Sequence, residues 1–194
     1  SNVVASNANG ILILACDKDE WGPAQNNWLT SDDVKAYSLP IFGGVFPFVL
    51  YKGASYEHGT LIIGLTFRPE IHIAKNISAS NEWSNALESY SVTYGHPYTQ
   101  LIFVDGLAKN IERVSEQIYS FLGEAATTVG CGAGSLDFQQ KPCIISSNGL
   151  LSDVVLIAAI DTKCGLGVNH GWEIFAGPFL VSRADKNCIS TLNY

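Results

Sequence analysis

Residues 130–135 combine three glycines with a cysteine and a serine in the order Gly-Cys-Gly-Ala-Gly-Ser. Glycines let backbone N–H groups approach a ligand closely and form concave anion sites. Gly130, Gly132, Gly134 and Ser135 are therefore candidates for holding a carboxylate or a phosphate. The stretch lacks the GxxxxGK[ST] pattern of a P-loop, and no helical pattern follows it directly, so a dinucleotide site is not indicated. The competing interpretation is a bulged or tightly packed strand.

Cys131, inside this stretch, is the candidate nucleophile of an alternative function, a thiol-dependent hydrolase or transferase. Such catalysis needs a neighbouring base that produces the thiolate. The histidines His58, His72, His96 and His170 are all remote from Cys131 in the sequence, so spacing predicts no pair. The competing interpretation is a buried cysteine that packs as a small apolar residue. The favoured function is therefore not catalytic.

Two further groups of residues could contact a ligand. Asp105 ends an apolar run, and ligands often bind beyond the carboxyl ends of strands, so Asp105 and Asn110 could hold an amino or hydroxyl group. The alternative is a turn followed by a helix cap, a role that Asn favours. His170 and Trp172 offer a ring donor and an aromatic wall, or else a turn with a packed Trp. No ligand set for zinc or calcium is found, and no metal or cofactor is expected.

Short apolar runs bounded by turn residues predict the strands that position these residues. The runs cover residues 11–16, 41–46, 48–51, 60–65, 71–73, 101–104, 142–145 and 154–160. A helix is predicted over 111–122, where apolar residues recur at helical spacing, with Asn110 before it and Gly123 after it. Shorter helices are predicted after Thr30 and after Ser80.

The order of these elements repeats once along the chain. Leu101 follows Leu12 by 89 residues and Gly130 follows Gly43 by 87, while two of the apolar strands are 94 residues apart. We interpret this as a duplicated β-α-β-β-β module, with repeats of roughly 10–75 and 99–162. The predicted fold class is α+β, with packed, mostly antiparallel sheets and flanking helices.

Composition excludes several classes of protein. The chain has 194 residues, of which 47% are hydrophobic and 15% charged, whereas disordered chains are polar and highly charged. The net charge of −7 and the lack of a Lys/Arg cluster argue against a nucleic-acid partner. No apolar run reaches the roughly 20 residues of a membrane span, so no membrane partner is expected. Five irregularly spaced cysteines favour reduced thiols and a cytoplasmic protein.

Several segments resemble the FIST N-terminal domain family, named for F-box and intracellular signal transduction. They are residues 103–110 (FVDGLAKN), 129–134 (VGCGAG), 148–158 (NGLLSDVVLIA) and 170–172 (HGW). The resemblance covers roughly residues 10–194 and rests on glycine and apolar patterns. It implies a single N-terminal-type domain over 1–194, in which residues 163–194 lead toward a C-terminal domain that the chain lacks.

The resemblance also implies a function, a sensory domain that binds small ligands, among them amino acids, in signal transduction. The expected ligand site comprises Asp105, Asn110, the 130–135 stretch, His170 and Trp172. The expected partners are a small-molecule ligand and either a C-terminal FIST domain or a signalling protein. Besides the thiol enzyme, a second alternative is a protein-interaction module without a ligand.

Overall fold

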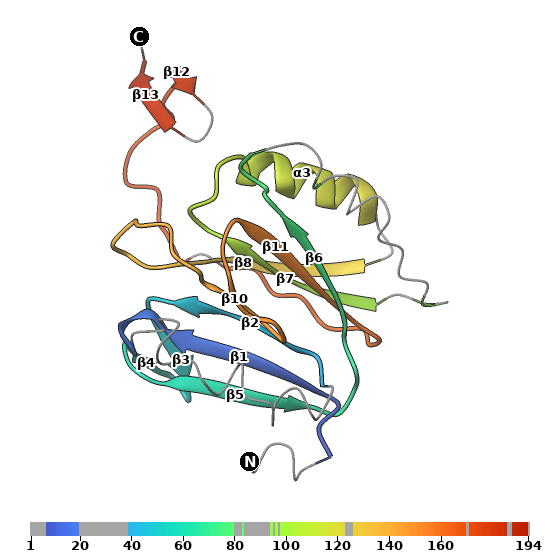
Figure 1. Cartoon of the computed structure of the whole chain (residues 1–194). Coiled ribbons are helices and arrows are strands. Elements are labelled where there is room, and N and C mark those ends of the chain that lie inside the picture. The colour runs from blue at the N-terminus through green and yellow to red at the C-terminus, as the bar shows by residue number, and fades with distance from the viewer. Residues whose placement is uncertain are drawn as a thin grey trace.

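The computed structural model describes residues 7–19, 39–79, 83, 94, 96, 98–122, 126–169, 171–185 and 188–193. Two sheets form the body (Figure 1). Sheet 1 has the order β10-β9-β2-β1-β5, and sheet 2 has the order β6-β11-β7-β8. Sheet 1 contains β1 (Gly10–Cys16), β2 (Ile41–Phe46), β5 (Thr60–Leu65), β9 (Ile144–Ser146) and β10 (Gly149–Leu151). Sheet 2 contains β6 (Glu70–Lys75), β7 (Tyr98–Asp105), β8 (Ala126–Ala133) and β11 (Val154–Ile160).

Strand β11 explains how the layers stack, because both of its faces are covered. Val154, Leu156 and Ala158 belong to the core between the two sheets, together with side chains of β1, β2 and β9. The alternate residues Val155, Ile157 and Ala159 belong to a second core on the other face of sheet 2. A strand buried on both faces needs a continuous apolar run rather than alternation, and all seven residues of β11 are buried.

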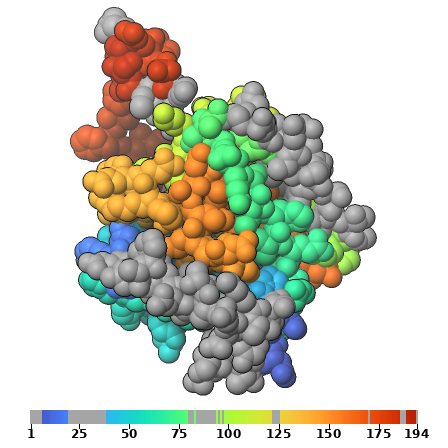
Figure 2. Space-filling model, viewed as in Figure 1, coloured from blue at the N-terminus to red at the C-terminus, as the bar shows by residue number. Residues whose placement is uncertain are grey.

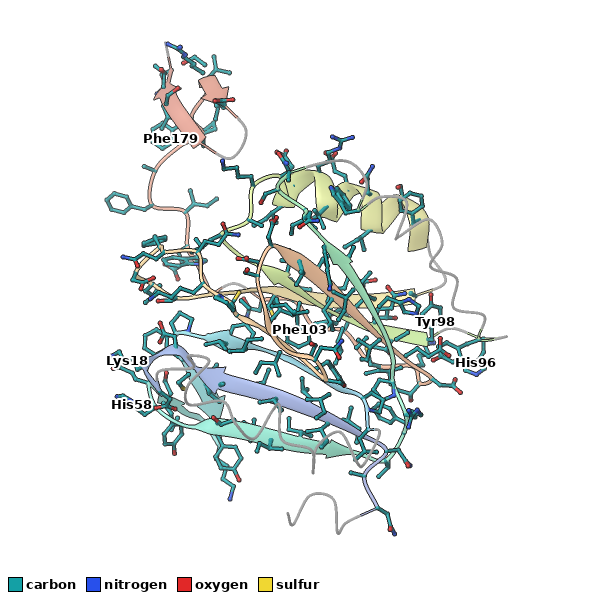
Figure 3. All side chains as sticks on the ribbon, viewed as in Figure 1. Lys18, His58, His96, Tyr98, Phe103 and Phe179 are labelled. Carbon is teal, nitrogen blue, oxygen red and sulfur yellow. The ribbon has the colours of Figure 1, made fainter. Side chains whose placement is uncertain are left out.

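Helix α3 (Ile111–Leu122) covers the outer face of sheet 2. Val114 and Ile118, one turn apart, pack in the second core with Ile102 and Ala159. This is the helix that the apolar spacing predicts. The body is therefore three layers, with sheet 1, sheet 2 and α3 in that order, and Phe103 lies between the sheets in contact with the ring of Phe42 (Figure 3).

Two hairpins and a short helical turn complete the described structure. The 3-10 turn η2 (Asp17–Asp19) follows β1, and β3 (Val49–Tyr51) pairs with β4 (Ala54–Tyr56). After β11 the described residues form no strand until β12 (Val181–Asp185), which pairs with β13 (Cys188–Leu192). We call the described residues between 163 and 193 the C-terminal arm, and its β12–β13 hairpin stands out from the body (Figure 2). Within the described residues no helix is long and apolar enough to cross a membrane.

The α+β class with mostly antiparallel sheets is confirmed. Seven of the nine strand pairings described are antiparallel, and the parallel ones are β1 with β2 and β7 with β8. A strand is found at each expected run, although β9 begins at Ile144 rather than at residue 142. β4, β10 and the arm hairpin are additional, and β8 forms where a packed strand was the competing interpretation. Of the expected flanking helices only α3 falls in the described part of the chain, since the predictions after Thr30 and Ser80 lie outside it apart from Trp83.

The two sheets share one strand arrangement. β1 pairs in parallel with β2 and antiparallel with β5, and β7 likewise pairs in parallel with β8 and antiparallel with β11. Glycines occupy the same register position, because Gly43 lies opposite Ile13 and Gly130 opposite Ile102. Each sheet also contains strands from the other half of the chain. β6, from the first half, joins sheet 2, whereas β9 and β10, from the second half, join sheet 1.

Candidate functional site

Asp105 is the last residue of β7 and only 1% of its surface is exposed. Its register partner is Ala133 at the end of β8. Because β7 and β8 are parallel, their carboxyl ends lie side by side at one end of sheet 2. The 132–135 stretch therefore lies beside Asp105, and we call this end of the sheet the Asp105 edge. Gly106 N–H donates to the Ala133 carbonyl at 2.7 Å and holds the two strand ends together.

The Asp105 carboxylate accepts hydrogen bonds from three neighbouring segments. Oδ1 accepts from the backbone N–H of Leu107 at 3.1 Å. Oδ2 accepts from the backbone N–H of Asp153 at 2.7 Å and from the side-chain amide of Gln140 at 3.0 Å. Every one of these donors is electrically neutral. A buried charge is normally paired or extensively hydrogen-bonded, and here neutral dipoles alone perform that role.

Asp153 extends this arrangement to the start of α3. Its Oδ1 accepts from Ser78 N–H at 3.0 Å, and Ser78 Oγ in turn accepts from Lys109 N–H at 2.8 Å. Asn110 donates its side-chain amide to the Ser78 carbonyl at 3.3 Å, and its own carbonyl accepts the N–H of Val114, the first helical bond. Asn110, at φ +71°, thus starts the helix while its side chain anchors a neighbouring turn.

The glycine stretch is a regular part of β8 as far as Ala133. A Cβ on Gly130 would lie 3.1 Å from the Ile102 carbonyl oxygen, and one on Gly132 would lie 3.2 Å from the Gly106 Cα. These glycines therefore allow close packing of β8 on β7 and its following turn. Gly134, at φ +148°, donates its N–H to the Val45 carbonyl of sheet 1 at 2.8 Å. Ser135 Oγ accepts from Asp137 N–H at 3.2 Å.

The loop of residues 135–142, between β8 and β9, covers the Asp105 edge with exposed side chains. Gln140 reaches inward from this loop although its residue is exposed. Asp137 forms an ion pair with Lys141 and accepts from Gln139 N–H at 2.9 Å. Asp137 also has its pKa lowered, first by the Lys141 hydrogen bond. The loop is thus braced by its own contacts and linked to the buried carboxylate by one amide.

The thiols near this edge are poorly suited to nucleophilic chemistry. Cys131 lies on the exposed stretch of β8, yet partial desolvation of its thiol raises its pKa above the ordinary value. Cys143 is buried, and burial together with the neighbouring Asp105 charge raises its pKa to about 12. A catalytic thiol requires the opposite shift.

The remaining predicted site residues are spread more widely. Asp105, Asn110, Gly132, Gly134 and Ser135 gather at one edge of sheet 2. Gly130 and Cys131 pair with Ile102 and Phe103 further back along β7. Trp172 is 82% exposed on the C-terminal arm, and His170 lies outside the described residues.

Sequence reasoning missed the partners of Asp105. Gln140 and Asp153 lie 35 and 48 residues away along the chain, and a polar loop residue gives no sign of pointing inward. The Ser152-Asp153 pair between two apolar runs was a turn signal. That signal would have identified Asp153 as a partner of Asp105 only if the turn between β10 and β11 had also been placed beside the end of β7.

A second polar cluster occupies the opposite end of sheet 2, where Figure 3 labels His96 and Tyr98. His96 Nε2 lies 3.0 Å from Asp161 Oδ1, and the Tyr94 ring stacks on His96 and meets Tyr98 edge-on. Burial, followed by the nearby Glu70 carboxylate, raises the pKa of Tyr94 to about 12. No set of three or more His, Cys, Asp or Glu that could hold a metal ion occurs among the described residues.

Comparison with known proteins gives a family for this architecture. Neither a curated protein nor a solved structure matches the chain. The FIST N domain family matches residues 30–194, which include all of sheet 2, α3, the Asp105 edge and the C-terminal arm. With this match covering well over half of its length, the chain belongs to the FIST N domain family.

Proposed function

We propose that this chain is a cytoplasmic sensory domain that binds a small polar metabolite, such as an amino acid, at the Asp105 edge of sheet 2. FIST domains are associated with sensory functions in signal transduction, which supports the sensory part of the proposal. The ligand class rests on the chemistry of the edge itself. A C-terminal FIST domain or a signalling partner protein would respond to the conformational change that binding causes.

One observation carries the proposal, the buried Asp105 carboxylate whose described donors are all neutral. An ammonium group would be a stronger partner for Oδ2 than the Gln140 amide, because it adds the attraction of a positive charge to the hydrogen bond. Gln140 comes from an exposed loop, whereas the other donors to Asp105 are two backbone N–H groups and the buried Cys143 thiol. Gln140 is therefore the donor that a ligand can replace.

The far end of such a ligand would lie toward Gly134 and Ser135. The backbone there follows the end of β8, beside Asp105, and Ser135 offers its hydroxyl. A ligand that also used the N–H groups of Asp137 or Gln139 would displace the hydrogen bonds that they donate to Ser135 and Asp137. Asn110 belongs to the proposed site through the Ser78 turn, because its side-chain amide donates to the Ser78 carbonyl. An amino group and a carboxylate separated by one carbon fit a site with a carboxylate at one end and N–H and O–H donors at the other.

Replacement of Gln140 gives the binding event a structural consequence. The 135–142 loop is tied to the body at Asp105 by the Gln140 amide. When a ligand occupies Oδ2, this tie is lost and the loop takes up a different position. Binding thus shifts a conformational equilibrium by the difference in ligand affinity between the two loop positions. A partner that contacts the loop reads that shift.

The experiment is titration calorimetry of the intact chain with a panel of amino acids, together with their decarboxylated and deaminated analogues. Gln140→Ala should bind a given amino acid more tightly, because the competing amide is gone, and Asp105→Asn should lose binding. Gln139→Ala, the same change one residue away on the same loop, should match the unaltered chain. Binding that survives Asp105→Asn, or no binding to a folded chain at millimolar ligand, would overturn the proposal.

The internal duplication is proposed as the origin of this fold. It is supported by the matching strand directions of β2-β1-β5 in sheet 1 and β8-β7-β11 in sheet 2. The glycines opposite Ile13 and Ile102 also support it. In that alignment Asp105 takes the place of Cys16, since these residues end β7 and β1 and pair with Ala133 and Phe46. Only the second copy would then carry the carboxylate.

A further inference from the structure

The loop of residues 135–142 is fixed near both of its ends by one residue of β2. The Val45 carbonyl accepts from Gly134 N–H at 2.8 Å, and the Val45 N–H donates to the Cys143 carbonyl at 2.8 Å. A compact surface loop whose two ends lie close together is an Ω-loop, and such loops are frequently functional. The body thus holds the base of this loop in place, and any movement is confined to residues 135–142.

Phe138, in the middle of this loop, has a backbone conformation that an aromatic residue rarely adopts. Its φ is +54°, in the left-handed region, where the Cβ of an L-residue crowds the following carbonyl oxygen. Asparagine and aspartate tolerate this region, and they account for five of the six other positive-φ residues that are described and are not glycine. The sixth, Lys52, lies with Gly53 in the β3–β4 hairpin turn, where positive φ is usual. Phe138 is therefore the position at which backbone strain is indicated.

The Phe138 ring does not offset this strain by packing, because 77% of the residue is exposed. Polar contacts across Phe138 hold its backbone instead. Gln139 N–H donates to Asp137 Oδ1 at 2.9 Å, which closes a turn around Phe138, and Asp137 also pairs with Lys141. Contacts between such exposed groups compete with water and contribute little to stability. The strained loop therefore needs a further contact to stay in this position.

We infer that Phe138 is a positioning residue that holds the loop under backbone strain, and that the hydrogen bond from Gln140 to the buried Asp105 keeps the strained loop closed. When Gln140 leaves Asp105, Phe138 relaxes to negative φ and the loop opens. The inference rests on the proposed function in one respect, because an amino acid at Asp105 is the agent that displaces Gln140.

The direction of the effect follows from the loop position that carries the strain. The ligand binds the open position, in which Asp105 Oδ2 is available, so whatever disfavours the closed position raises the apparent affinity. A left-handed backbone at an ordinary residue lowers the ratio of closed to open loops by about fivefold to thirtyfold. Phe138 thus makes the loop easier for a ligand to open, without touching the ligand.

The first test needs no ligand and follows amide hydrogen exchange in the loop by NMR. The reporter is Gln139 N–H, whose hydrogen bond spans Phe138 and is lost when the loop opens. Phe138→Gly accepts the left-handed backbone, whereas Phe138→Ala removes the ring and keeps the strain. We expect Gln139 N–H to be about fivefold better protected in Phe138→Gly than in Phe138→Ala, the low end of the range, because glycine also gains freedom in the open loop. Phe138→Asn should change in the same direction.

The matched control is Leu136→Gly, on the same loop at an exposed position outside the left-handed region. It should give no rise in the protection of Gln139 N–H. A rise as large as that in Phe138→Gly would overturn the inference, because it would show that glycine anywhere in the loop has this effect.

The second test asks whether the Gln140 contact opposes the strain. Gln140→Ala should lower the protection of Gln139 N–H, and adding Phe138→Gly should restore it, because an unstrained loop stays closed without the contact. Adding Leu136→Gly to Gln140→Ala should restore nothing. A residue with a merely structural role at position 138 would not produce this rescue.

The third test links the strain to the ligand, with the amino acid of the titrated panel that binds the unaltered chain most tightly. Calorimetry should show about fivefold weaker binding to Phe138→Gly than to Phe138→Ala. Equal protection in these two variants, or no rescue, would overturn the inference whether or not a ligand binds. Protection that rises while the affinity stays equal would overturn it too. If no amino acid binds, the proposed function fails, and the exchange experiments still decide whether Phe138 strains the loop.

Discussion

The backbone N–H of Asp153 donates to Asp105 Oδ2 at 2.7 Å and joins two turns that lie 48 residues apart in the sequence. Through this bond the end of β7 is connected to the β10–β11 turn, and through Ser78 to the start of α3. One buried carboxylate therefore organises three connections at one edge of sheet 2, and it is also the group on which the proposed ligand site depends.

Removal of that carboxylate should destabilise the fold. Asp105→Ala leaves the backbone N–H groups of Leu107 and Asp153 and the Cys143 thiol without this acceptor. A buried unsatisfied donor costs about 1–3 kcal/mol. We expect the free energy of unfolding in urea to fall by about 3 kcal/mol or more. Asp137→Ala, on the exposed loop, should unfold at nearly the same urea concentration as the unaltered chain. Equal unfolding midpoints for the Asp105 and Asp137 variants would show that the hydrogen bonds at Asp105 contribute nothing to stability.

Gly43 should tolerate no side chain. A Cβ there would lie 1.8 Å from the Ile13 carbonyl oxygen, and the backbone is at φ +149°. Gly43→Ala should therefore lower the stability by about 3 kcal/mol or more. Gly165→Ala is the matched control, because a Cβ at Gly165 meets nothing within 4 Å. Circular dichroism during thermal unfolding measures both, and a Gly43 variant as stable as the Gly165 variant would contradict the close approach of β1 and β2.

The thiols should react slowly at neutral pH. Only the thiolate is nucleophilic, and desolvation raises the pKa of Cys131 above its ordinary value while Cys143 titrates at about 12. Alkylation by iodoacetamide, followed residue by residue with mass spectrometry, should be slow at pH 7 and accelerate toward pH 10, with Cys143 slowest. Rapid, selective modification of Cys131 at pH 7 would instead revive the thiol-enzyme alternative.

Alkaline pH should weaken the fold partly through Tyr94. Its pKa is about 12 in the folded chain, mainly because of burial, and about 10 when unfolded. Between these values the folded state holds a proton that the unfolded state has released, so stability falls as pH rises through this window. The urea midpoint should drop less steeply from pH 9.5 to 11.5 in Tyr94→Phe. Tyr119→Phe, at a 79% exposed position, should keep the slope of the unaltered chain. Equal slopes for Tyr94→Phe and the unaltered chain would contradict the role given to Tyr94.

Local patterns in the sequence predicted most of the elements, because the relevant physics is local. The seven-residue apolar run at 154–160 predicted strand β11, and the helical spacing of apolar residues such as Val114 and Ile118 predicted α3. The glycines at 43 and 130 lie opposite Ile13 and Ile102, and the duplication that their spacing suggested stays a prediction. These signals depend on periodicity and backbone sterics, which a single sequence displays directly.

Partner choice between distant segments escaped prediction. Nothing in residues 70–75 indicates that β6 joins sheet 2 rather than sheet 1, because its apolar residues suit either core. Likewise, Gln140 gives no sign in the sequence that it turns inward to Asp105. The glycine stretch was read as a ligand cradle or a packed strand, and it runs as β8 up to Ala133. Its role in ligand binding stays a prediction.

The strand exchange between the halves has a consequence for synthesis on the ribosome. Gly43 pairs with Ile145, and Glu70 with Ala159, so the two sheets cannot be completed until β10 and β11 have emerged. Folding dominated by such distant pairings is slow and leaves apolar strands uncovered for longer. We therefore expect the yield of folded protein on expression to rise when chaperones are supplied in excess.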